Sequence, residues 1–534
     1  MMRKILSLLC AMALMLPLSV AFSEERPTIS IGIPDHPLVE DWETNLQTLQ
    51  IEETLGIDLT FQKLPYDANE YLQKIELMVM NGGEDLPDVL ISTGFDLAAL
   101  QVYGEMGMLI PLNEYMNDTP YLDESLAAMR VLPLSKEDYL MYLTCSDGNI
   151  YGFGYAFQSI NNSLSPARVM VYEPWLETLG LTIPETTEEF RDMLIAFRDR
   201  DPNGNGIQDE IPLMGHKGTV NSNFMRFLMN PFVFVQENYL INNAGTIEFA
   251  AIQDGWKEGL KFVQSLFAEG LVSSLTLTQD QTQFTSLLAA EPESIGAIAM
   301  VSASVLPASD SRREEYIILK ALEGPDGTRQ YPQRPNIPSV RFVITRNCEN
   351  VEAAIALGDY LSSIEMNNWS RYGIAGEHYA YLEIPQAGQY DSLGFQGDIT
   401  ITNNIWGISQ NVLWEQVGPV VGDGSTITYR IAVNPTEGNY DHSTPIGRTI
   451  RNNLDYVVPE KGVYGLVFTA EEQEIITEYR SAINTYVEES FARFITGSGD
   501  IDAEWENYVE ELYRMGLQEY LDALNSCWSR MHAK

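Results

Sequence analysis

Strands and helices alternate in the first part of the chain, and this order constrains the fold more than any other feature. Short runs rich in apolar and β-branched residues at 27–34, 57–65 and 87–93 are typical of strands. The segments between them, 42–56 and 68–83, carry apolar residues at helical spacing and end at glycines. A β-α-β-α-β order with short connections is typical of a parallel sheet covered by helices. The sequence therefore predicts an α/β lobe of the doubly wound type.

The length of the chain requires more than this one lobe. A chain of 534 residues is too long for a single compact core and predicts two or three domains. Later strands are expected within 294–304 and 337–347, because both runs are apolar. From Thr469 onward the chain is expected to be helical, beginning with a capping box in "TAEE".

An amphipathic helix is predicted immediately before an oxygen-rich loop. Thr186 and Glu189 form a capping box at its start. Four apolar residues line one face of this helix: Phe190, Met193, Leu194 and Phe197. The loop that follows, "DPNGNGIQDE" at 201–210, alternates oxygen-bearing side chains with glycines.

This loop has the donor set of a calcium site. Ca²⁺ prefers six to eight oxygen ligands in a flexible arrangement. The predicted ligands are the side chains of Asp201, Asn203, Asn205, Asp209 and Glu210 and the backbone carbonyl of Ile207. An EF-hand would carry a glutamate where this chain has Pro212, and a second helix would follow. The pattern therefore favours a structural staple over a calcium sensor. The alternative is a solvated turn rich in Asn and Asp.

The N-terminus has the pattern of a signal peptide. Arg3 and Lys4 precede an apolar run at 5–18, and small residues up to Ser23 offer a cleavage site. We expect residues 1–23 to be removed and the protein to be exported, to the cell envelope or the extracellular space. A lipid anchor on Cys10 is not expected, because Leu9 stands where lipoprotein processing requires a small residue.

Charge and cysteine content exclude several classes of partner. The net charge of −43 repels nucleic acid and anionic lipid, so neither is expected to bind. After cleavage an odd number of cysteines remains: Cys145, Cys348 and Cys527. Their spacing is not that of a zinc site, and a chain with a large core does not need disulfides. We expect buried free thiols.

The segment "TTEEFRDMLIAFRDRDPNGNGIQDEIPL" resembles the helix and calcium loop of the family 1 extracellular solute-binding proteins of ABC transporters, the LipO-like or oligosaccharide-binding group. Other stretches agree in order, among them "WKEGLKFVQSLFAEGLV", "FVITRNCENVEAAIALGDYLSS" and "RYGIAGEHYAYLE". The resemblance covers nearly all of the mature chain. Many relatives carry a lipobox, and this chain shows none.

This resemblance implies a type II periplasmic-binding-protein fold, in which two α/β lobes joined by a hinge close on a ligand. The expected first lobe is 24–145 with a return segment at 330–366. The second lobe is expected at 146–329, with its remainder and a helical C-terminal region at 367–534. The resemblance also implies an oligosaccharide ligand, the permease subunits of an ABC importer as partners, and no catalysis. We expect the protein to act as a monomer.

Ligands of open α/β sheets bind beyond the carboxyl ends of the strands, and flat aromatic rings stack on sugar faces. From the first lobe this nominates Tyr66, Ser92, Thr93, Gly94 and Phe95. From the second lobe it nominates Tyr155, Phe157, Trp369, Tyr372, Glu377, His378 and Trp406, with Tyr155 and Trp406 as first choices opposite Phe95. Asp96 is a weaker polar candidate. Core packing is the alternative for each aromatic residue, and it is the expected role of Trp175, Trp256 and Trp505.

Three other functions compete with sugar transport. The ligand could instead be a peptide or another solute. A secreted glycoside hydrolase would need a carboxylate pair, which 75 acidic residues could contain, although no catalytic motif is present. A calcium-dependent adhesion module would be expected to show repeats, and the sequence has none.

Overall fold

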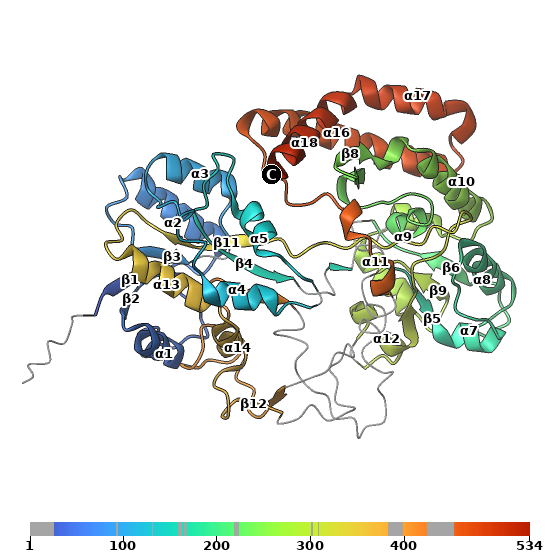
Figure 1. Cartoon of the computed structure of the whole chain (residues 1–534). Coiled ribbons are helices and arrows are strands. Elements are labelled where there is room, and N and C mark those ends of the chain that lie inside the picture. The colour runs from blue at the N-terminus through green and yellow to red at the C-terminus, as the bar shows by residue number, and fades with distance from the viewer. Residues whose placement is uncertain are drawn as a thin grey trace, which may run out of the picture.

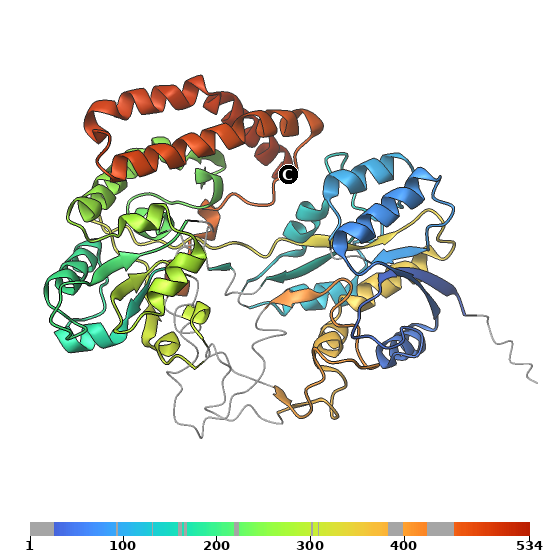
Figure 2. The same cartoon turned by 180° about the vertical axis from the view of Figure 1, so that it is seen from behind.

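The N-terminal β-α-β-α-β order forms one side of a six-stranded sheet, as the sequence predicts. The computed structural model describes residues 26–91, 94–130, 132–158, 163–164, 168–217, 224–300, 303–307, 309–382, 399–423 and 453–533. These residues form two α/β lobes with a helical region packed on the second (Figures 1 and 2). The predicted signal peptide and Cys10 lie outside the described residues. No helix in these ranges is long and apolar enough to cross a membrane.

The sheet of the first lobe combines strands from distant parts of the chain. Its order is β14-β4-β11-β3-β1-β2. The strands are β1 (Thr28–Pro34), β2 (Asp58–Leu64), β3 (Val89–Ile91), β4 (Gly152–Gln158), β11 (Ser339–Ile344) and β14 (Val421–Asp423). β11 runs antiparallel to both of its neighbours, β3 and β4, whereas β1 pairs in parallel with β2 and β3. The carboxyl ends of β1 to β4 therefore meet at the same edge as the beginning of β11.

Helices cover both faces of this sheet. They are α1 (Leu46–Leu55), α2 (Ala68–Met80), α3 (Leu97–Glu105), α4 (Pro120–Ala127), α5 (Lys136–Leu143), α13 (Val351–Leu361) and α14 (Ile364–Tyr372). Helix α2 buries Tyr71, Ile75, Met78 and Val79, the face that its sequence predicts. A small two-stranded sheet, β12 (Tyr379–Tyr381) with β13 (Ile399–Ile401), follows α14.

The second lobe has a four-stranded sheet in the order β10-β5-β9-β6. Its strands are β5 (Met170–Tyr172), β6 (Ile211–Met214), β9 (Ile295–Ile298) and β10 (Tyr316–Ile318). The helices are α7 (Glu173–Leu179), α8 (Thr187–Asp199), α9 (Met225–Met229), α10 (Asp254–Ala268), α11 (Gln281–Leu288) and α12 (Arg312–Glu315). The second lobe also contains an antiparallel hairpin of β7 (Leu240–Asn243) and β8 (Thr246–Phe249). The predicted capping box of Thr186 and Glu189 begins α8.

Three C-terminal helices extend the core of the second lobe. They are α16 (Ala470–Ile495), α17 (Ile501–Arg514) and α18 (Leu517–Met531), drawn in red above the green part of Figure 1. The predicted capping box at Thr469 begins α16. Trp256 on α10 is buried, and its ring centroid lies 6.0 Å from that of Phe491 on α16. The C-terminal helices thus share one hydrophobic core with the second lobe.

The division of the chain between the lobes differs from the expected boundaries. The sequence predicts that the second lobe begins at 146 and resumes at 367, but β4 and β14 both belong to the sheet of the first lobe. Trp414 and Val421 also pack in the core of the first lobe. The chain therefore passes between the lobes three times: after β4, before β11 and between β14 and residue 453. Local sequence patterns reveal strands but do not reveal which sheet a strand joins.

The three cysteines are buried and free, which confirms the prediction of unpaired thiols. Burial raises the pKa of Cys145 to about 12 and the pKa values of Cys348 and Cys527 to about 11. The side chains of Trp175 and Trp256 are also buried, and Trp505 is partly buried against the same core, as expected.

Candidate functional site

Several of the nominated residues lie where the carboxyl ends of the strands of the first lobe meet. Tyr66 follows β2, and its ring meets that of His36, which follows β1, edge to face at 4.7 Å between centroids. Gly94 and Phe95 follow β3, and the backbone N–H of Phe95 donates to the carbonyl of Val340 at the start of β11. The nominated Ser92 and Thr93 lie outside the described residues.

The aromatic residues at this edge differ in how far they are available to a ligand. The side chain of Tyr66 is 48% exposed. Phe95 is only 6% exposed and belongs to the hydrophobic core of the first lobe. Packing against that core therefore accounts for Phe95, and Tyr66 is the better candidate for stacking on this side.

Tyr155 lies on β4 and carries an arginine on its ring. The Cζ atom of Arg341, on β11, is 3.5 Å from the centroid of the Tyr155 ring. Both residues are only partly exposed. The ring of Phe157, also on β4, meets that of Tyr155 at 88° with centroids 6.3 Å apart. Burial raises the pKa of the Tyr155 hydroxyl, and the two nearby cations Arg341 and Arg371 oppose that shift.

Trp406 forms a second arginine–aromatic pair. The Cζ atom of Arg371, in the last turn of α14, lies 4.0 Å from the centroid of the Trp406 ring. Glu415 is buried close by and accepts a hydrogen bond from the backbone N–H of Gly407. Burial raises the pKa of Glu415, an effect that is partly opposed by the positive charge of Arg371.

The sequence suggested that Tyr155 and Trp406 oppose Phe95 across the two lobes, and the structure does not show this arrangement. β4 is a strand of the first sheet, and the loop after Trp406 pairs with the first lobe through Gln410 and Val39. Both residues therefore extend the edge on which Gly94 and Phe95 lie. The expectation was wrong because β4 was assigned to the second lobe.

The remaining nominated residues fall into structural and exposed groups. The indole N–H of Trp369 donates to the carbonyl of Val412, and Tyr372 is buried against Tyr379. His378 is also buried, and its Nδ1 accepts from the N–H of Ile374. Glu377 is exposed beside it. Asp96 caps α3 by accepting from the N–H of Ala98.

Two arginines and Glu415 at this site were not nominated from the sequence. Arg341 stands in the otherwise apolar run "SVRFVI", and a lone charge in a buried strand was the available signal. Arg371 and Glu415 carry no such signal, because their positions depend on how α14 and the loop before β14 fold back on the first sheet.

The oxygen-rich loop 201–210 forms a second candidate site, at the end of α8. Asp201 has a positive φ of 47°, and its carboxylate accepts from the N–H groups of Asn205 and Gly206. The Oδ1 atom of Asn205 accepts from the N–H of Ile207. The side-chain amides of Asn203 and Asn205 both donate to Asp209. The loop therefore gathers its polar side chains on one another.

Glu210 fits a cation at this loop. Both of its carboxylate oxygens are buried and have no hydrogen-bond partner. Burial raises the pKa of Glu210, and the negative charges of Asp201 and Asp209 raise it further. A buried carboxylate without a partner is unfavourable unless a cation neutralises it. In the described ranges no three His, Cys, Asp or Glu side chains form a metal cluster by themselves, so amide and carbonyl oxygens would have to complete the ligand set.

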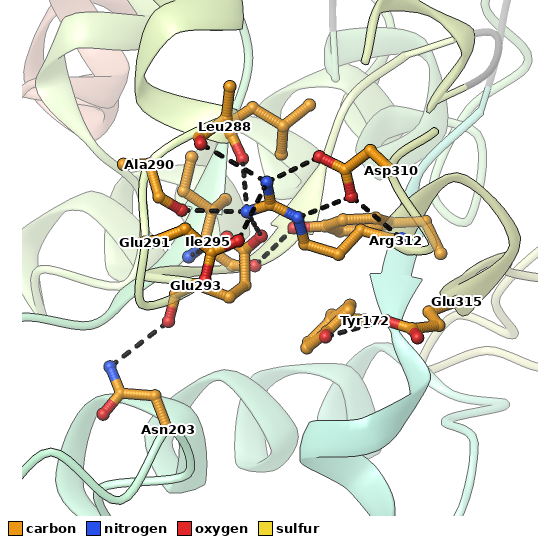
Figure 3. Close-up of polar contacts among 12 residues, drawn as sticks. Tyr172, Asn203, Leu288, Ala290, Glu291, Glu293, Ile295, Asp310, Arg312 and Glu315 are labelled. Carbon is orange, nitrogen blue, oxygen red and sulfur yellow. Dashed lines mark hydrogen bonds and ion pairs between the residues drawn. The ribbon is translucent and has the colours of Figure 1, made fainter. Parts of the chain in front are cut away.

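The loop is fastened to the sheet of the second lobe through Asn203. Its Nδ2 donates to the carbonyl of Glu293, just before β9, as Figure 3 shows. The Glu293 carboxylate pairs with Arg312 at 3.0 Å, and Asp310 pairs with the same guanidinium at 2.6 Å. The carbonyls of Leu288 and Ala290 accept from it as well. The interactions around Arg312 thus fix the position of Glu293, whose backbone carbonyl contacts the loop through Asn203.

Comparison with known proteins assigns this architecture. No family model matches the chain. The fructooligosaccharide ABC transporter substrate-binding protein FusA of Streptococcus pneumoniae is 25% identical over 521 residues, which are 93% of this chain and 89% of that protein. The HMO-binding ABC-transporter-associated solute-binding protein of Bifidobacterium longum infantis is 18% identical with a TM-score of 0.68 over 96% of this chain and all of that one. An EF-hand mutant of the S. pneumoniae protein in complex with fructo-nystose is 22% identical with a TM-score of 0.60, over 95% and 99% of the two chains.

The fold is therefore that of the substrate-binding proteins of ABC transporters, with two α/β lobes and a helical C-terminal region. The relationship to FusA confirms the predicted resemblance to the carbohydrate-binding members of this class. These relatives are solute-binding proteins and not enzymes, which agrees with the expected binding role without catalysis.

Proposed function

We propose that this protein binds an oligosaccharide at the edge where β1 to β4 end and delivers it to the permease subunits of an ABC importer. The observation that carries the proposal is the set of aromatic rings at that edge, Tyr66, Tyr155 and Trp406, in a chain related over 93% of its length to a fructooligosaccharide-binding protein. Sugars present apolar C–H faces to such rings, and the polar groups between the rings can bond the hydroxyls.

Closure of the two lobes would complete the site. The chain passes between the lobes three times, and the proposed closure would change the angle between the two lobes. Ligand binding would shift the equilibrium toward the closed arrangement by the difference between the binding free energies of the closed and open arrangements. The permease could then distinguish a loaded protein from an empty one. We expect the working protein to be a monomer, exported after removal of residues 1–23.

Calorimetry with a panel of oligosaccharides tests this proposal, with small-angle scattering of the same mixtures to follow closure. We expect one glycan class to bind without chemical change and to lower the radius of gyration. Chromatography of the recovered glycan controls for turnover. Binding of peptides in place of any glycan would contradict the assignment of the ligand, and binding at an unchanged radius of gyration would contradict the clamp.

We further propose that loop 201–210 holds one Ca²⁺. The side chains of Asp201, Asn203, Asn205, Asp209 and Glu210 and the carbonyl of Ile207 are the proposed ligands. The buried carboxylate of Glu210, which has no hydrogen-bond partner, supports the fit. The cation would be the positively charged partner of this carboxylate. Because α8 ends at this loop and Asn203 fastens it to Glu293, the proposed role is to stabilise the second lobe.

The experiment for this site is a melting curve with and without Ca²⁺ on the parent and on the double variant Asp201→Ala, Asp209→Ala. A ligand that binds only the folded protein stabilises it by mass action. We expect Ca²⁺ to raise the Tm of the parent but not that of the variant, with glycan affinity nearly equal in both. A parent Tm that does not respond to Ca²⁺ or to a chelator would contradict the proposal.

A further inference from the structure

Among the described residues, no hydrogen-bond acceptor contacts the side chain of Arg341 at the candidate ligand site. Its Nε atom is buried and makes no hydrogen bond. No ion pair or hydrogen bond joins its guanidinium to any residue that the structure describes, and its one ring contact is with Tyr155 at 3.5 Å. Burial lowers the pKa of Arg341, which still leaves it charged at neutral pH. A buried cation without a carboxylate is costly to the empty protein.

The direction of the Arg341 side chain is set by an irregularity in the backbone of β11. The pairing of β11 with β4 shifts register between Val340 and Phe342, so that Arg341 is the extra residue of a β-bulge. Bulges next to binding sites redirect a side chain out of the regular alternation of the strand. The bulge places Arg341 over Tyr155, at the edge where Tyr66 and Gly94 also lie.

Arg371 repeats the arrangement a short distance away. Its guanidinium covers Trp406 at 4.0 Å, and no ion pair or hydrogen bond of the guanidinium is found within the described ranges. Both arginines act electrostatically on the Tyr155 hydroxyl, so both lie within electrostatic range of that group. Glu415 is the carboxylate that interacts with Arg371, and this interaction partly opposes the rise that burial causes in the pKa of Glu415.

Two other arginines with little exposure do have carboxylate partners in this protein. Arg312 pairs with Glu293 and Asp310, and Arg329 lies within ion-pair distance of Glu185 and Glu323. In a chain with 75 acidic and 32 basic residues, such partners are abundant. Arg341 stacks on a ring and has no such partner among the described residues, and Arg371 stacks on a ring with only Glu415 acting on it. An anion that arrives with the ligand would explain this arrangement.

We propose that Arg341 and Arg371 form a subsite for a carboxylate carried by the sugar, so that the ligand is an acidic oligosaccharide containing uronate residues. This inference rests on the proposed function and specifies its ligand class. A planar guanidinium binds a carboxylate through two parallel hydrogen bonds. Tyr155 and Trp406 hold the two guanidinium planes in place before the ligand binds.

Calorimetry with three matched ligands tests the inference at a fixed Ca²⁺ concentration: an oligogalacturonate, its methyl ester and a neutral fructo-oligosaccharide of similar length. We expect the parent to bind the oligogalacturonate at least about tenfold more tightly than its methyl ester, because only the free acid makes a charge-assisted pair. Arg341→Gln should lose that preference while binding the methyl ester within about threefold of the parent. Arg341→Lys should retain part of it, since the charge remains but the fork geometry is lost.

Arg514→Gln, an exposed change on α17, is the matched control and should alter none of the three affinities. Melting curves confirm that each variant is folded. Binding of the neutral and esterified glycans as tight as that of the acid would overturn the inference but leave the proposed function standing. An Arg341→Gln variant that weakens all three ligands alike would also overturn it. Failure of every glycan to bind the parent would instead contradict the proposed function itself.

Discussion

Asn203 donates a hydrogen bond from Nδ2 to the carbonyl oxygen of Glu293 at 3.2 Å, and this contact joins two segments 90 residues apart. On one side lies the oxygen-rich loop, and on the other lies the ion pair of Glu293 and Arg312. Order in the loop is thereby connected to a buried network of the second lobe. Changes in the loop should consequently be visible as changes in the stability of that lobe.

Glu210→Gln should have opposite effects with and without calcium. In the absence of the metal the variant removes a buried, unpartnered charge next to Asp201 and Asp209. The free energy of unfolding should therefore increase by roughly 1 kcal/mol, and the Tm should rise. With Ca²⁺ present the variant lacks a charged ligand, and the calcium-induced rise in Tm should shrink. Differential scanning fluorimetry at several Ca²⁺ concentrations measures both effects.

Glu506→Gln is the control for this variant, because Glu506 is an exposed acidic residue on α17. It should change the Tm little at any calcium concentration. If Glu210→Gln lowers the Tm equally with and without Ca²⁺, Glu210 has a structural role that does not involve the cation.

Tyr155→Ala should weaken glycan binding without loss of the fold. The ring supports Arg341 and is one of the proposed stacking surfaces, so its removal should cost about 1–3 kcal/mol of binding free energy. Tyr155→Phe keeps the ring and should bind nearly as well as the parent. Isothermal titration calorimetry with the glycan identified by the panel measures this difference, and equal affinities for parent and Tyr155→Ala would exclude Tyr155 from the site.

Trp256→Ala should destabilise the second lobe together with the C-terminal helices. Trp256 is buried between Tyr239 and Phe491, and truncation of a buried aromatic residue typically costs about 3–5 kcal/mol. Trp505→Ala is the matched variant, and its cost should be smaller because this tryptophan is only partly buried. Chemical denaturation measures both, and an equal cost would show that α17 packs as firmly as α10.

The three thiols should react slowly in the native protein. With pKa values of about 11 to 12, roughly one part in a thousand or less of each thiol is ionised at pH 8, and only the thiolate reacts. Ellman's reagent should label all three cysteines of the mature chain once it is unfolded in guanidinium. Rapid labelling of the native protein would show that at least one of these segments opens readily.

Features that depend on neighbouring residues were predictable from the sequence. The capping boxes at Thr186 and Thr469 and the buried face of α2 need only residues a few positions apart. The oxygen-rich loop is equally local, because all of its side chains lie within ten consecutive residues. Such patterns fix both the element and its polarity without knowledge of the rest of the fold.

Features that depend on long-range pairing were not predictable in the same way. β4 pairs with β11 and β14, and both of these strands lie far along the chain from β4. The lobe to which β4 belongs could therefore not be assigned from its own residues. The lone charge of Arg341 is visible in its strand, but the bulge that sets the direction of its side chain arises from the mismatch between two strands and cannot be read from either one. Several nominated residues consequently fall on the sheet of the first lobe, although the sequence assigned them to the second.

The place of β11 between β3 and β4 affects how the protein can be made. A ribosome completes β3 and β4 well before β11, so β3 can pair only with β1, and β4 has neither of its two neighbours, until β11 arrives about 180 residues after β4. During that interval the nascent first lobe exposes two unpaired strand edges, which are prone to pair with other chains. Most of the second lobe is synthesised in the meantime. Productive folding therefore favours a chain kept unstructured until synthesis is complete, and fragments that end before residue 339 should aggregate.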